Sequence, residues 1–87
     1  MTRQRLFEIA QAFGLTCATE RVTTGAVNGE AFREFEFTGN LPEHCADMAK
    51  LVRKEWGVTR DFCAARMSDD DYKAYVHVSS FYCGPNA

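Results

Sequence analysis

The chain has 87 residues and a formal net charge of −2, and its apolar (46%) and charged (25%) fractions are those of a folded protein. This length fits one domain, which we place at residues 1–87, and the composition excludes disorder. A net acidic chain argues against general DNA or RNA binding, because such binding depends on neutralising phosphates. No apolar run reaches the roughly 18 residues that cross a bilayer. The basic start leads into no continuous apolar stretch, so we expect a cytoplasmic protein without a signal peptide.

The first helix is predicted over residues 3–13. Leu6, Ile9 and Phe13 recur at helical spacing, and Thr2 can cap the first turn. Gly14 suits the left-handed residue that often follows a helix.

A β-hairpin is predicted over residues 17–38. Asn28 and Gly29 form a typical two-residue tip, because a type I′ turn needs positive φ at both central positions. This tip places Val22 opposite Phe35 on an apolar face, with the charged side chains of both strands on the other face.

A second helix is predicted over residues 41–56, where apolar residues again recur at helical spacing. Asn40 is the expected N-cap, with Glu43 completing a pattern like a capping box. Gly57 is expected to end the helix.

A second hairpin is predicted over residues 58–83, with its tip at Asp69 and Asp70. In that register Cys63 lies opposite Val76 on an apolar face. The other face of this hairpin is not clearly polar, so either it is covered in the fold or it is a contact surface.

The two halves of the chain echo each other. Phe13-Gly14-Leu15-Thr16 and Trp56-Gly57-Val58-Thr59 share an aromatic-Gly-aliphatic-Thr ending, and a hairpin follows each. We therefore predict an α+β fold of order α-β-β-α-β-β, made of halves at about 2–38 and 40–83. The sheet would be four-stranded and antiparallel, with both helices packed on one face.

The sequence contains few residue patterns typical of metal binding, catalysis or phosphate binding. The spacing of the four cysteines fits no common zinc pattern, and without an export signal we expect free thiols, no metal and no cofactor. Cys63 and His77 fall on opposite faces of their hairpin and cannot form a catalytic dyad. The chain also has no glycine-rich phosphate loop. We therefore expect a protein that is not an enzyme.

The final hairpin is the predicted partner-binding surface. Phe62, Tyr75 and His77 lie on its second face, where the predicted register pairs Phe62 with His77. Three consecutive acids at the tip could attract a basic partner. Phe32 breaks the alternation of the first hairpin and is a further candidate. The full set of predicted contact residues is Phe32, Phe62, Asp69, Asp70, Asp71, Tyr72, Tyr75 and His77. In the alternative interpretation a helix covers this face and the acids only solvate a turn.

A small acidic domain without a catalytic set is best interpreted as a binding module that occludes or modulates another macromolecule, most simply a protein. Phage-encoded inhibitors of host defence complexes, such as anti-CRISPR proteins, are of this kind, although no motif in the chain defines that group. The alternative is a nucleic-acid-binding accessory protein that uses Arg3, Arg5 and a basic patch on the second helix. That patch comprises Lys50, Arg53, Lys54 and Arg60. The sequence leaves the identity of the partner and the oligomeric state open.

Overall fold

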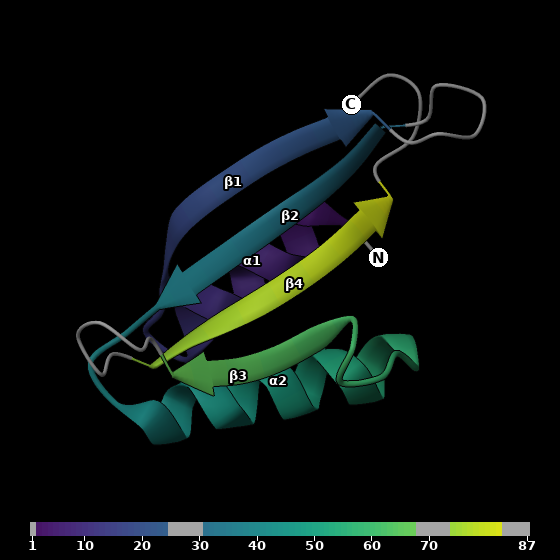
Figure 1. Cartoon of the computed structure of the whole chain (residues 1–87). Helices are drawn as coiled ribbons and strands as arrows, with labels where there is room; N and C mark the ends of the chain where they lie inside the picture. Colours follow the sequence, from purple (N-terminus) through teal and green to yellow (C-terminus); the bar gives the residue numbers. More distant parts are fainter. Residues whose placement is uncertain (1, 25–30, 68–73, 83–87) are drawn as a thin grey trace.

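The computed structural model describes residues 2–24, 31–67 and 74–82. Its elements follow in the order α1 (Arg3–Ala12), β1 (Thr16–Thr24), β2 (Ala31–Thr38), α2 (Pro42–Trp56), β3 (Cys63–Met67) and β4 (Ala74–Tyr82). The strands form one sheet of order β1-β2-β4-β3, and all neighbouring strands are antiparallel. Both helices lie on the same side of this sheet (Figure 1). The predicted α+β fold, with its α-β-β-α-β-β order, is confirmed.

Both helices end in the same way, as the echo in the sequence indicates. Gly14 and Gly57 have φ values of 72° and 64°, in the left-handed region that glycine enters without steric strain. The next residue then donates its N–H back across the last turn, from Leu15 to Ala10 O at 2.8 Å and from Val58 to Arg53 O at 3.2 Å. These bonds satisfy carbonyls that would otherwise lack a partner at the helix ends.

The helix starts differ from each other. Thr2 caps α1 as predicted, because its Oγ1 accepts the Arg5 N–H at 3.2 Å. The predicted cap of α2 is wrong: the N-cap is Leu41, which makes no side-chain capping bond, and not Asn40. The cause is Pro42, which holds the residue before it in an extended conformation (φ −122°, ψ 127°) and itself needs no N–H partner in the first turn.

The predicted strand registers are wrong by two residues in both hairpins. Val22 lies opposite Arg33 instead of Phe35, and Cys63 lies opposite Val78 instead of Val76. A shift of two keeps Val22 and Cys63 on their predicted faces, whereas a shift of one would have moved each strand's apolar set into solvent. Cys17 is the exception, because an irregularity in the pairing between Cys17 and Thr19 places it opposite Phe37, on the core side. The predicted tips at Asn28-Gly29 and Asp69-Asp70 lie outside the described residues.

The core lies between the sheet and the two helices. Phe7 of α1 packs edge-on against Phe35 and Phe37, with ring centroids 5.7 and 5.3 Å away. Burial of apolar area here is the main stabilising contribution to the fold. The completely or almost completely buried side chains are Leu6, Ile9, Ala10, Leu15, Phe35, Phe37, Cys45, Met48, Ala49, Val52, Cys63, Val76 and Val78.

Candidate binding surface

The pairing of β2 with β4 joins the two hairpins and creates a continuous surface on the side of the sheet away from the helices. Along each strand, alternate side chains point to opposite faces. The residues between the buried ones therefore share the helix-free side, which we call the open face. It carries Arg21 of β1, Glu34 and Glu36 of β2, Tyr75 and His77 of β4, and Arg66 of β3.

Glu34 is the centre of the polar contacts on the open face. Its Oε1 lies 3.1 Å from His77 Nε2 and 3.8 Å from Arg21 Nη2. Arg21 Nη2 also lies 4.0 Å from Oε1 of Glu36, which is directly opposite His77. Exposed ion pairs of this length contribute little to stability. These contacts hold two carboxylates at the centre of the open face, and Arg21 and Arg66 lie on the strands at its two borders.

The side chains of the open face differ in accessibility. The Arg21 side chain is 63% exposed, the two glutamates about one third, and His77 only 21%. Tyr75 is half-buried. A partner would therefore meet a partly buried centre of Glu34, Glu36 and His77, with the exposed basic side chains of Arg21 and Arg66 on the two edge strands.

The structure brings together two of the predicted contact residues and separates a third from them. Tyr75 and His77 lie on the open face, while Phe62 precedes β3 and packs half-buried against the core. The predicted pairing of Phe62 with His77 is wrong, because the two-residue shift places Ala64 opposite His77. For Phe32 the structure describes only the backbone, which lies opposite Thr23 and Tyr82. Asp69, Asp70, Asp71 and Tyr72 lie outside the described residues.

Three further members of this surface were not predicted as contact residues: Arg21, Glu34 and Glu36. Within the first hairpin alone they form an ordinary solvated face with one favourable charge pair. They become neighbours of Tyr75 and His77 only through the pairing of β2 with β4. The signal available in the sequence was the matching α-β-β halves, whose hairpins can share one sheet.

A second group of charges joins α1 to the sheet. Arg3 donates to both carboxylate oxygens of Glu20, from Nε at 2.8 Å and from Nη2 at 3.0 Å, and Arg33 Nη1 donates at 2.7 Å. The hydrogen bonds from Arg3 lower the pKa of Glu20, and the same contact raises the pKa of Arg3. Arg3 also lies over the Phe7 ring, with its guanidinium carbon 4.2 Å from the centroid.

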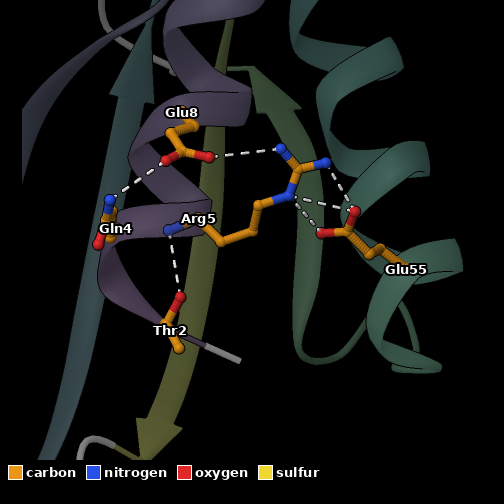
Figure 2. A network of polar contacts seen from close by, with 5 residues as sticks. All are labelled: Thr2, Gln4, Arg5, Glu8 and Glu55. Carbon is orange, nitrogen blue, oxygen red and sulfur yellow. Dashed lines mark hydrogen bonds and ion pairs between the residues drawn. The ribbon is translucent and has the colours of Figure 1, made fainter.

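A third group joins the two helices, as Figure 2 shows. Arg5 holds Glu55 with a paired contact, from Nη2 to Oε1 at 2.7 Å and from Nε to Oε2 at 2.9 Å. Arg5 Nη1 also lies 3.5 Å from Glu8 Oε2. The pKa of Glu55 is lowered, chiefly by its hydrogen bonds from Arg5. Two N-terminal arginines that could have met a phosphate backbone are thus engaged with carboxylates.

The three cysteines of the described chain are free thiols that are buried or partly buried. Cys17, Cys45 and Cys63 are free, and burial raises the pKa of each, that of Cys63 to about 11. Since the thiolate is the reactive form, such groups are poor nucleophiles near neutral pH. Cys63 and His77 lie on opposite faces of the sheet, as their register positions require. Within the described ranges, no three His, Cys, Asp or Glu side chains are grouped as metal ligands.

One larger cavity, of about 510 Å³, lies where β2 ends and α2 begins. Its described lining carries no charged side chain. The lining residues are Gly14, Thr16, Thr38, Gly39, Asn40, Pro42 and Ala74.

Comparison of the chain with known protein families, with curated proteins and with solved structures gives no match. Neither helix in the described part of the chain is long and apolar enough to span a membrane.

Proposed function

We propose that this chain is a protein-binding module and that the open face of its sheet is the docking surface. It would act by occluding or modulating its partner, as phage-encoded inhibitors of host defence complexes do, anti-CRISPR proteins among them. The observation that carries the proposal is the ordered acidic centre of the open face, where Glu34 contacts both His77 and Arg21.

The composition of the open face favours a protein partner with a basic contact surface. Tyr75 and Arg21 belong to the residue types that are enriched in protein interfaces. At its centre, Glu34 and Glu36 would repel phosphates but attract lysine and arginine side chains, while Arg21 and Arg66 at the borders would pair with acids of the partner. Such complementary charge speeds association and selects the partner. The predicted acidic segment at residues 69–71 precedes β4 in sequence and adds charge of the same sign.

The alternative, nucleic-acid binding through a basic patch, has less support. It relied on Arg3 and Arg5, which are held by Glu20 and Glu55. Arg53 uses part of its guanidinium to donate to the Cys63 carbonyl at 2.9 Å. The remaining basic side chains of α2 are adequately explained by solvation and by the helix dipole, which favours cations at the C-terminal end.

The test combines affinity capture with charge reversal on the open face. Tagged wild-type protein, Glu36→Lys and Tyr75→Ala would each be used to capture proteins from an extract of the natural host. Asp47→Lys is the matched control, because it makes the same charge change on the exposed side of α2. We expect a protein that binds the wild type and the control, and that binds each open-face variant at least about tenfold more weakly.

Two results would contradict the proposal. In one, the captured partner binds the open-face variants and the wild type equally well. In the other, nuclease treatment removes the captured material and its binding falls steeply with salt, which would favour the nucleic-acid alternative.

A further inference from the structure

A second surface, distinct from the open face, runs along the outer edge of β3. β3 is the last strand in the sheet order, and α2 lies beside it in Figure 1. Between the two elements lies a cavity of about 210 Å³, which we call the edge groove. It is lined by Ala46, Ala49, Arg53, Arg60, Ala64 and Ala65. Four of these six side chains are single methyl groups, so the groove has room for side chains from another chain.

The hydrogen-bonding pattern of β3 directs the backbone N–H and carbonyl of Ala65 toward this groove. Both polar backbone groups of Cys63 are used away from β4: its N–H donates to Thr59 O at 3.1 Å, and its carbonyl accepts from Arg53 Nη1 at 2.9 Å. In an antiparallel ladder, residues that bond to the neighbouring strand alternate with residues that do not. Ala65, two positions further on, therefore directs its N–H and its carbonyl outward, toward the edge.

The edge groove is cationic at one end. Arg53 and Arg60 lie beside the start of β3. A guanidinium has five N–H donors, so Arg53 keeps donors beyond the one used on Cys63, and Arg60 is exposed. This end is suited to a carboxylate.

The other end of the edge groove is apolar. α2 and β3 run in opposite directions (Figure 1), so the end of β3 lies near the first turn of α2. Two contacts agree with this placement: Met67 pairs with Ala74, and Ala74 lines the same cavity as Pro42. The large apolar side chains that are exposed in the described part of the chain are Leu41 and Met67, 48% and 56% exposed. Neither lines the edge groove itself, but Met67 is the last residue of β3 and Leu41 directly precedes α2. An apolar side chain of a partner strand opposite Met67 would cover Met67.

We propose that an extended segment of a partner protein adds to β3 as a fifth, antiparallel strand, with a large apolar residue followed four positions later by Asp or Glu. Strand addition supplies affinity through main-chain hydrogen bonds and specificity through alternate side chains. This inference goes beyond the open face and does not depend on it.

The order and spacing of the two residues follow from the pairing geometry. In an antiparallel pair, the residue opposite Met67 comes first and the residue opposite Cys63 comes four positions later. Residues directly opposite each other share a face. Both partner side chains would therefore point to the side of the sheet on which α2 lies, one toward the apolar end and one toward Arg53 and Arg60.

The test uses displayed libraries of ten-residue peptides. The first library has Leu, Ile or Val fixed at position 3 and Asp or Glu fixed at position 7. A second has Asn or Gln at position 7, and a third has the two fixed positions exchanged. We expect binders from the first library, and at least about tenfold fewer from the other two.

Protein variants locate the binding. Ala65→Pro removes an edge N–H but no bond to β4, and proline is tolerated at such an edge position. Arg60→Gln removes a charge on an exposed side chain and leaves the backbone intact. Each variant, checked for an unchanged thermal melt, is expected to bind the selected peptides at least about tenfold more weakly. Lys54→Gln, which removes the same charge from an exposed side chain of α2 that does not line the edge groove, is the control and should bind like the wild type.

Three outcomes would overturn the inference. Equal selection from the first two libraries would remove the role of the carboxylate, and undiminished binding to Ala65→Pro would place the peptide elsewhere. A wild-type dimer that Ala65→Pro converts to a monomer would show that a second copy of this chain occupies the edge. All three are distinguishable from failure of the open-face proposal, because Glu36→Lys and Tyr75→Ala leave the edge groove intact.

Discussion

His77 and Glu34 meet on the open face although they belong to different hairpins, with Nε2 of the histidine 3.1 Å from Oε1 of the glutamate. The contact crosses from β4 to β2, where the two α-β-β halves join. It therefore depends on the pairing of the halves and not on either hairpin alone. Their neighbours along the chain, Val76 before His77 and Phe35 after Glu34, point to the other side of the sheet and are completely buried.

Because consecutive side chains of β4 point to opposite faces, replacing two of them with alanine should lower the free energy of unfolding by different amounts. Val76→Ala removes buried methyl groups and should destabilise the fold by about 2–3 kcal/mol. Tyr75→Ala, on the open face, loses cross-strand contacts and should lower the free energy of unfolding by about 1 kcal/mol or less. Urea denaturation of the two variants and the wild type measures both. Equal losses would mean that the open face is covered and belongs to the core.

A second prediction compares the contributions of Thr2 and Asn40, at the N-terminal ends of α1 and α2, to stability. Thr2→Ala removes the side-chain acceptor for the Arg5 N–H and should lower the free energy of unfolding by about 1 kcal/mol. Asn40→Ala removes no cap, because Leu41 occupies the N-cap position of α2, so its effect should stay within about 0.5 kcal/mol. Thermal or urea unfolding compares the pair directly. A larger loss for Asn40→Ala than for Thr2→Ala would contradict this account of α2.

Helix ends and strand faces were predictable from the sequence because they depend on local chemistry. Gly14 and Gly57 mark the helix ends, since a positive φ favours glycine. The faces of Phe35 and Val76 follow from alternation with a period of two. Alternation cannot detect a shift of two residues, however, which is why both registers were wrong while the faces of Phe35 and Val76 were right. Nor does it predict the irregularity between Cys17 and Thr19, which turns Cys17 toward the core.

The candidate surface was only partly predictable for a different reason. Tyr75 and His77 were identified because they depart from the polar pattern expected of a solvated strand. Glu34 and Glu36 follow that pattern, and their meeting with His77 depends on a contact between residues about 40 positions apart. Such non-local pairing is set by the packing of both helices on one side of the sheet, which no single segment encodes.

The last prediction concerns acid pH and Glu20. Its carboxylate accepts hydrogen bonds from Arg3 and Arg33, and the Arg3 bonds lower its pKa. A lowered pKa means that the unfolded chain binds a proton more readily than the folded one, so stability rises with pH over this range. The contribution of Glu20 is fully present above the unfolded pKa of about 4.3 and is lost as the pH falls through the folded value.

Glu20→Gln should therefore lower the free energy of unfolding at pH 7, by less than about 1 kcal/mol because Arg3 is half exposed and solvent screens the pair. The difference from the wild type should shrink steadily below about pH 4. Asp47→Asn, an exposed acid of α2 with no ion pair among the described residues, is the control and should show a smaller difference at every pH. Urea midpoints between pH 7 and pH 2.5 provide the measurement. If the wild type and Glu20→Gln differ by the same amount throughout this range, the contact with Arg3 and Arg33 does not stabilise the ionised carboxylate, and the link between α1 and the sheet rests on apolar packing alone.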